Sequence, residues 1–471
     1  MCTYRLYFVL VSLLAPLCAA GALTLLLLLA AAAVESAAST WAAVAALAAL
    51  AVFMQLKSTR IRNRIAAWPG FCAREFVPHT CAELQLAIAQ AKRTGCRRGA
   101  YPEIVGHGWG YFLSRTASQG PRIYTHRMQK REGLWWNAGA TLEDVARHYE
   151  QKENGNKALT SAPTMNYISV GAWFAMGNHG NGGNHPQTLG SSGTMRQARI
   201  VDMETQEVRC VDYKKLRCLF DDPATARRYC VLQVCIDESS LAENKFLKKC
   251  AIDVNTKETA DEWLKGNARL RVLFMGAARS YGLGIRWDDA DENELKQNRH
   301  VDPHFGSRRS TYLQADVCSI VCGWREATKK WSGVTTYANA NRWMPFVFPW
   351  QMALTAAAGY INYELVFRLA CFEKTKLWRL VCDMIQVHRL CGGRSEVRHG
   401  QSGKAIFLDV SMRAHFKEPL RVIKALGVEK FALHPGKYQL HFSDEMLCEI
   451  GLERCTLGQI YFGTDESLFR V

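Results

Sequence analysis

The chain has 471 residues, too many for one compact core and about right for a membrane anchor followed by two packed domains. Its net charge of +16 is dispersed among acidic residues, without the dense basic patches of a nucleic-acid groove, so we expect no nucleic-acid partner. A basic solvated surface, a membrane surface or a negatively charged cofactor would each account for the excess.

Cysteine usage points to a compartment. The 17 cysteines are scattered, with neither the spacing of a zinc site nor a disulfide framework. Scattered cysteines are typical of free thiols in a reducing environment. We therefore expect the catalytic part of the chain to face the cytosol.

The first 64 residues contain two apolar runs. Residues 6–34 carry no charged side chain and are long enough to cross a bilayer, and residues 37–56 form a second run before a basic cluster at 57–64. One interpretation is a helical hairpin oriented by the positive-inside rule; the other is a cleaved signal peptide, since the alanines offer several cleavage sites. The length of the first run favours a membrane anchor of one or two transmembrane helices at residues 1–64.

The soluble part begins with regular elements. Residues 76–96 are predicted to be a strand entry followed by a helix, because Thr80 and Glu83 can form a capping box and apolar residues then recur at helical spacing. A short apolar strand at 103–105 runs directly into the glycine-rich segment 106–110.

A second strand and helix follow. The strand at 134–137 ends in the small residues 138–140, after which Thr141 is expected to cap an amphipathic helix. The order strand, helix, strand, glycine loop, strand, helix indicates an α+β domain. Near the end of the chain, residues 405–412 are predicted to form a further strand.

Two glycine-rich segments carry the strongest functional signal. They are Gly106-His-Gly-Trp-Gly110 and the longer segment 163–183. Glycines let the backbone approach a ligand closely, and successive free amides form a concave anion site suited to a pyrophosphate. Neither segment matches a Walker loop or a Rossmann fingerprint, which argues against a P-loop NTPase or a simple NAD enzyme.

The sequence V-G-H-G-W-G, the strand ending N-A-G-A-T and the run P-T-x-N-Y-I-S-V-G-A-x-F-A-x-G-x-H-G resemble the FAD-binding (PCMH-type) domain of the vanillyl-alcohol oxidase superfamily over about residues 70–210. The resemblance implies FAD as cofactor, with its pyrophosphate held by backbone amides. Asn178 and His179 could alternatively serve only the structure of the loop. The residues that the resemblance assigns to the cofactor are Gly106, His107, Gly108, Trp109, Gly110, Pro163, Thr164, Ser169, Gly171, Gly177, Asn178, His179 and Gly180.

Two C-terminal motifs refine the resemblance. Glu396-Val-Arg398 is similar to the E-x-R motif, and His434-Pro-Gly-Lys437 to the H-W-x-K motif, of the aldonolactone oxidoreductase and alditol oxidase branch. The implied catalytic residues are Glu396 and His434, which would position the substrate, and Arg398 and Lys437, which would assist loss of the hydroxyl proton. A lysine near the flavin N1 would stabilise the charge that reduction leaves there.

Two departures from the family pattern bear on the cofactor and the substrate. Trp109 stands where many relatives carry the histidine that binds FAD covalently, so we expect noncovalent FAD, with a shifted linkage through His107 as the alternative. Pro435 replaces the motif tryptophan. The acidic run at 288–292 is typical of a solvated loop, and we expect no metal site.

The predicted fold is α+β. It comprises a two-subdomain FAD-binding domain (65–240), a mixed α+β substrate or cap domain (241–390) and a segment completing the active site (391–471). The predicted function is an FAD-dependent oxidoreductase that oxidises a hydroxyl-bearing sugar lactone or polyol by hydride transfer to flavin N5 and passes electrons to an undetermined acceptor. The alternatives are a flavin-dependent sterol or lipid reductase and a non-catalytic FAD-fold protein.

Overall fold

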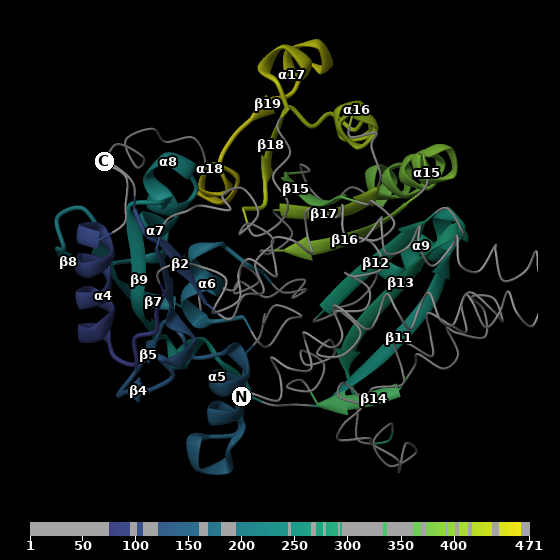
Figure 1. The fold of residues 1–471 in the computed structure, drawn as a ribbon. Coiled ribbons are helices and arrows are strands. Elements are labelled where there is room, and N and C mark those ends of the chain that lie inside the picture. Colours follow the sequence, from purple (N-terminus) through teal and green to yellow (C-terminus); the bar gives the residue numbers. More distant parts are fainter. Residues whose placement is uncertain are drawn as a thin grey trace, which may run out of the picture.

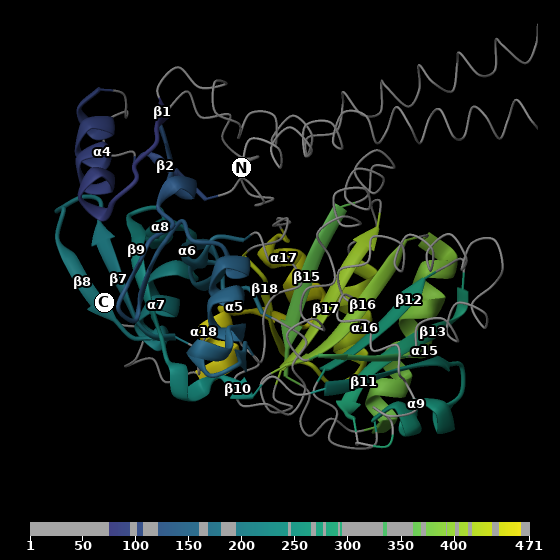
Figure 2. The same ribbon diagram turned by 90° about the horizontal axis from the view of Figure 1, so that it is seen from below.

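The computed structural model places an N-terminal part of small sheets and helices beside a large C-terminal sheet (Figures 1 and 2). No helix among the residues it describes combines the length and apolar composition of a bilayer crossing. The expected anchor at 1–64 lies outside them. The described residues are 75–94, 101–106, 121–159, 168–179, 195–243, 246–264, 270–276, 279–290, 293, 333–336, 361–368, 374–391, 393–400, 405–412, 417–435 and 442–462.

The first N-terminal sheet is small and parallel, with β3 between β1 and β2. Helix α4 (Cys81–Thr94) covers it with Leu84, Ile88 and Ala91, which are fully buried. The helical spacing read from the sequence is therefore confirmed. The three strands are β1 (Glu75–Phe76), β2 (Glu103–Val105) and β3 (Arg122–Tyr124).

The second N-terminal sheet has five antiparallel strands in the order β4-β5-β9-β7-β8. Its central strand β9 is buried along its whole length, which makes it the core of this part. The strands are β4 (Arg131–Glu132), β5 (Trp135–Asn137), β7 (Met195–Asp202), β8 (Val208–Val211) and β9 (Tyr229–Ile236). The helices packed with them are α5 (Leu142–Glu150), α6 (Val170–Ala175), α7 (Tyr213–Phe220) and α8 (Pro223–Ala226).

Helix α5 begins where the sequence predicted. The Thr141 hydroxyl accepts a hydrogen bond from the Asp144 amide, and the Asp144 carboxylate accepts one from the Thr141 amide, which completes a capping box. Leu142, Val145 and Tyr149 lie on its buried face. Strand β6 (Lys157–Ala158) pairs with β10 (Ala242–Glu243) in a separate two-stranded antiparallel sheet.

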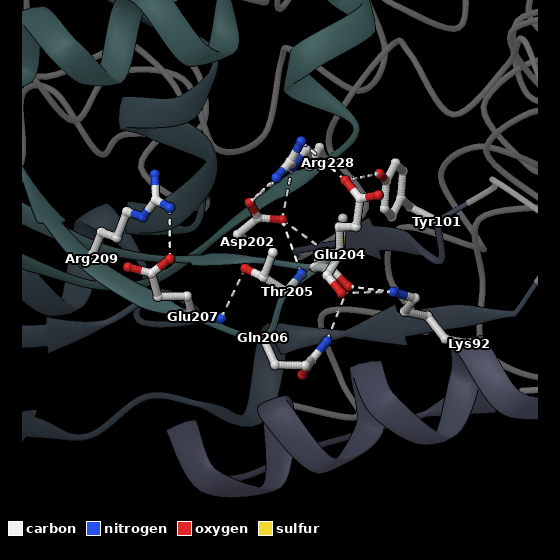
Figure 3. A network of polar contacts seen from close by, with 10 residues as sticks. Lys92, Tyr101, Asp202, Glu204, Thr205, Gln206, Glu207, Arg209 and Arg228 are labelled. Carbon is white, nitrogen blue, oxygen red and sulfur yellow. Dashed lines mark hydrogen bonds and ion pairs between the residues drawn. The ribbon is translucent and has the colours of Figure 1, made fainter. Parts of the chain in front are cut away.

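A polar network ties α4 to the turn between β7 and β8 (Figure 3). The Asp202 carboxylate accepts hydrogen bonds from Arg228 Nε at 2.9 Å and from the Glu204 amide at 2.8 Å, and Lys92 Nζ donates to the Met203 carbonyl at 2.9 Å. Burial alone would raise the pKa of Asp202, but the hydrogen bonds from Arg228 and from backbone amides outweigh it, so the pKa is lowered.

The C-terminal part is built on one sheet of nine strands, in the order β14-β11-β13-β12-β16-β17-β15-β18-β19. All neighbours are antiparallel except β18 and β19. The strands are β11 (Phe246–Val254), β12 (Leu270–Gly276), β13 (Arg279–Asp289), β14 (Gly333–Thr336), β15 (Ile361–Phe367), β16 (Arg394–Gly400), β17 (Ala405–Met412), β18 (Lys430–Leu433) and β19 (Glu453–Arg454). Because β12 pairs with β16, segments 241–390 and 391–471 share one sheet.

The two faces of this sheet differ in chemistry. One face is apolar: Leu365, Val397 and Leu408 are buried in a core shared with the helices. Those helices are α9 (Lys257–Leu264), α15 (Lys374–Cys391), α16 (Lys417–Ala425) and α17 (Asp444–Ile450). Because side chains alternate along a strand, the neighbours Glu364 and Glu396 point to the opposite face.

Helix α18 (Leu457–Phe462) joins the two parts. Its residues Leu457, Ile460 and Tyr461 are buried against Val366 and Phe407 on the second face of the sheet. The helix also packs on α7 of the N-terminal part, and Figure 2 shows it, in yellow, among the N-terminal helices. The acidic face of the sheet therefore lies at the boundary between the two parts.

Candidate functional site

Three segments meet at the start of α6: the first glycine-rich segment at Gly106, residues 138–140 and residues 169–172. The Val170 amide donates to the Ala140 carbonyl at 2.7 Å, and the Gly171 amide donates to the Ala138 carbonyl at 2.9 Å. The Ser169 hydroxyl caps the helix by accepting from the Ala172 amide at 3.3 Å. The turn that closes β5 is thereby fastened to the second glycine-rich segment.

Glycines permit these close approaches. A Cβ added at Gly106 would come within 2.4 Å of Ser169 Oγ, so the first glycine-rich segment also begins against the cap of α6. A Cβ at Gly139 would lie 1.7 Å from the Thr125 carbonyl oxygen, and one at Gly171 would lie 2.8 Å from the Ala138 Cβ. At each position a Cβ would therefore force its neighbour to shift.

The first amides of α6 are already engaged by protein oxygens. Val170, Gly171 and Ala172 donate to Ala140, Ala138 and Ser169 respectively. These three amides join segments, and binding of a pyrophosphate would fall to other amides of the two glycine-rich segments. The assigned cofactor residues outside the described part of the chain are His107, Gly108, Trp109, Gly110, Pro163, Thr164 and Gly180.

The end of α6 explains Gly177 and Asn178. Gly177 has φ +60° and its amide donates to the Phe174 carbonyl at 3.2 Å, while the Asn178 amide donates to the Trp173 carbonyl at 3.0 Å. This pair of hydrogen bonds is a Schellman motif, which requires the left-handed conformation that glycine adopts most easily. Asn178 Nδ2 also donates to the Ala172 carbonyl at 3.4 Å, so both residues serve the helix end.

A buried arginine supports the same helix end. Arg217 Nη2 donates to the Phe174 and Ala175 carbonyls, where a cation interacts favourably with the helix dipole. Its Nη1 lies 3.2 Å from Asp221 Oδ1, and Asp221 Oδ2 accepts from the Gly458 amide of α18 at 2.7 Å. Burial raises the pKa of Asp221, against the opposing effects of Arg217 and the Gly458 amide.

His179, in the turn after α6, contacts the C-terminal sheet. His179 Nε2 lies 3.2 Å from Glu364 Oε2, and its ring stacks on Phe407 with centroids 3.5 Å apart. His434, at the end of β18, contacts the same carboxylate: Nδ1 is 4.0 Å from Oε2, and Nε2 is 3.1 Å from the Gly177 carbonyl oxygen. These three titratable side chains are buried, with relative exposures of 5%, 0% and 2% for His179, Glu364 and His434.

A row of carboxylates crosses the same face of the sheet. Glu396 lies opposite Asp409, and Asp409 lies opposite Glu364. The row ends at His434, whose amide donates to the Glu364 carbonyl at 3.0 Å. Side chains directly opposite each other in a sheet have Cβ atoms about 4.5–5.5 Å apart, so the row is one continuous polar strip. It lies at the boundary between the two parts.

The expected catalytic residues divide into three groups. Glu396 and His434 are brought into the same row, at its two ends. Arg398 lies two residues further along β16, paired with Phe407, and Lys437 lies outside the described residues. The acidic run at 288–292 is described only through residue 290, and there Asp288 forms an ion pair with Arg286 at 2.7 Å.

Sequence reasoning missed Glu364 and Asp409. A signal existed for both, because each is a single acid inside an apolar strand: Ile-Asn-Tyr-Glu-Leu-Val-Phe in β15 and Ala-Ile-Phe-Leu-Asp-Val-Ser-Met in β17. Acidic residues are almost never fully buried unless they have partners. Their partners, such as His179 for Glu364 and Asn362 for Asp409, come from distant parts of the chain.

No protein-family model and no curated protein sequence matches the chain. Among solved structures, the BBE-like protein 28 of Arabidopsis thaliana is similar with a TM-score of 0.51 and 11% identity, over 88% of this chain and 92% of that chain. Cholesterol oxidase of Brevibacterium sterolicum is similar with a TM-score of 0.50 and 9% identity, over 75% and 79%. Glucooligosaccharide oxidase of Acremonium strictum has a TM-score of 0.47 and 11% identity, over 84% and 88%.

At these identities the likeness concerns the fold. The chain shares its mixed α and β architecture with the Arabidopsis protein and with cholesterol oxidase, which confirms the expected fold class at that level.

Proposed function

We propose that the chain is an FAD-dependent oxidoreductase that oxidises a hydroxyl-bearing sugar lactone or polyol. The observation that carries the proposal is the meeting of Gly106, residues 138–141 and residues 168–171 at one point, in a fold shared with cholesterol oxidase and a BBE-like protein. Those are the segments whose sequences resemble an FAD-binding domain.

The described residues form the framework that holds the two glycine-rich segments, which are proposed to bind the dinucleotide. The first segment starts at Gly106 beside the cap of α6, and the second contains α6 itself and Gly177 beyond its last turn. The amides that would hold the pyrophosphate are proposed to be those of residues 107–110 and 180–183. When bound, FAD would supply a hydride acceptor, and Trp109 in place of a linking histidine supports noncovalent binding.

The acidic row supports a polyhydroxyl substrate. Glu396 and Asp409 are about nine-tenths buried at the boundary between the two parts. They lie on the sheet face that is proposed to face the substrate. Carboxylates accept hydrogen bonds from hydroxyl groups. The apolar body of a sterol offers no such donors, so burying carboxylates beside it would cost free energy. Glu396 is therefore proposed to bind the substrate hydroxyls, as in the aldonolactone oxidoreductase and alditol oxidase branch.

The other motif residues are proposed to act on the reacting hydroxyl and on the contact between the two parts. Arg398 and Lys437 would stabilise the developing alkoxide as the hydroxyl proton leaves. His434 hydrogen-bonds Gly177 and lies beside Glu364, so it would act by holding the two parts in register. The proposal includes a membrane anchor at residues 1–64, with the catalytic part in the cytosol.

The test is reduction of the purified full-length chain under anaerobic conditions. A visible flavin spectrum that is bleached by aldonolactones or polyols supports the proposal. Bleaching by NADPH alone would identify the sterol or lipid reductase alternative, and a bound flavin that no donor reduces would identify a non-catalytic protein. Replacement of Glu396 by Gln should slow bleaching by the sugar-type donors.

A further inference from the structure

The atoms of the His179, Glu364 and His434 cluster have the spacing of metal ligands. Glu364 Oε2 lies 3.2 Å from His179 Nε2 and 4.0 Å from His434 Nδ1. One ligand atom from each of the three residues lies within 4.8 Å of the other two. Zinc binds histidine nitrogen and carboxylate oxygen at about 2.0–2.2 Å.

The hydrogen bond of His434 to Gly177 sets which nitrogen faces the carboxylate. A carbonyl oxygen only accepts, so Nε2 donates to Gly177 and carries the proton. In that tautomer Nδ1, 4.0 Å from Glu364 Oε2, is the ring nitrogen whose lone pair can bind a metal ion. Histidines that bind metals characteristically donate their other ring N–H to a backbone carbonyl in this way.

The separations from Oε2 are compatible with a shared ion. At 3.2 and 4.0 Å, they bracket the roughly 3.3 Å between two ligands of one tetrahedral zinc ion. Three buried groups therefore offer two nitrogens and one oxygen to one ion.

We propose that His179, Glu364 and His434 form a binding site for one divalent transition-metal ion of the zinc class. Two histidines with one glutamate are a ligand set that zinc accepts, with a fourth position for water. The buried Asp409, opposite Glu364 on the neighbouring strand, adds negative charge that a divalent ion would offset. The ion would fasten the turn after α6 to strands β15 and β18, and its binding would add to the folding stability of the chain.

The experiment is metal analysis of the full-length chain, purified without chelators or metal-affinity resin. We expect about one zinc-class ion per chain. Glu364→Gln and His434→Gln should each lower the content at least fivefold. Two matched variants should retain it: Asp202→Asn removes a buried carboxylate elsewhere, and His388→Gln removes a buried histidine that contacts Ser395 at 2.8 Å.

A second measurement needs no variant. The wild-type chain is stripped with a chelator, and zinc chloride is added during thermal unfolding; we expect the melting temperature to rise with zinc concentration. Absence of metal in the folded wild-type chain, together with a melting temperature that zinc leaves unchanged, would overturn the proposal. So would metal that both Glu364→Gln and His434→Gln retain, because the ion would then lie elsewhere.

Discussion

Gly139→Ala tests whether the segments meet as described. The added Cβ would lie 1.7 Å from the Thr125 carbonyl oxygen, whereas Cβ contacts essentially never fall under 3.0 Å. The backbone must therefore move by about 3.0 − 1.7 = 1.3 Å. Forcing an extra methyl group into a packed site costs about 1–3 kcal/mol, and the short distance to a backbone atom places this change near 3 kcal/mol.

The displacement should affect both stability and cofactor binding. A loss of about 3 kcal/mol lowers the melting temperature of a domain of this size by roughly 6–12 °C. Ala138 and Ala140 accept the amides of Gly171 and Val170, so moving Gly139 shifts the start of α6 as well. We expect FAD to bind at least tenfold more weakly, measured by titration of the full-length chain with FAD and detection of flavin fluorescence.

Gly133→Ala is the matched control. Gly133 has φ +60° and no atom within 4 Å of its hypothetical Cβ, so the change costs about 1 kcal/mol of backbone strain and leaves the cofactor segments in place. Equal melting temperatures and equal FAD affinities for the two variants would refute the close approach of Gly139 to Thr125.

Three further predictions follow from the described contacts. The pKa of Asp202 is lowered in the folded chain, so its contribution to stability is present above its unfolded pKa of about 4 and is lost as the pH falls through the folded value. Chemical denaturation should show Asp202→Asn less stable than wild type by about 2 kcal/mol at pH 7. The difference in stability should shrink below about pH 4. Burial raises the pKa of Cys230 to about 12, so mass spectrometry after iodoacetamide treatment at pH 8 should find Cys230 unmodified and the exposed Cys210 alkylated; the reverse pattern would contradict the packing of β9. Glu396→Gln should lower kcat/KM about 100-fold on sugar-type donors with an unchanged melting temperature, and an unchanged kcat/KM would remove Glu396 from the proposed site.

Local elements were predictable from the sequence because their signals are local. The cap at Thr141 and the spacing of Leu84 and Ile88 lie within one helix each, and the structure confirms both. The strands at 103–105 and 405–412 were predicted with the bounds that the structure shows.

The roles of single glycines could not be read in the same way. A glycine that ends a helix and a glycine that approaches a ligand both require freedom at φ, so Gly177 carried the same signal for either role. The hydrogen bonds of Gly177 and Asn178 to Phe174 and Trp173 show how both residues end α6. The distinction depends on contacts that the spacing of glycines does not encode.

The acidic row depends on strand pairing across long distances in the chain. Glu364, Glu396 and Asp409 come from three strands whose register is set by the whole sheet. The partner of Glu364 from the N-terminal part, His179, is 185 residues away. A one-residue shift in the register of any strand would turn its acid to the other face, so the row could not be predicted from the sequence alone.

The most direct measurement of the central claim is the FAD content of the full-length chain, purified without added cofactor and reconstituted with excess FAD. The account predicts about one FAD per chain, released by heat or acid because it is noncovalent. A folded chain that stays colourless after reconstitution would contradict the assignment of the two glycine-rich segments to FAD, and with it the proposed function.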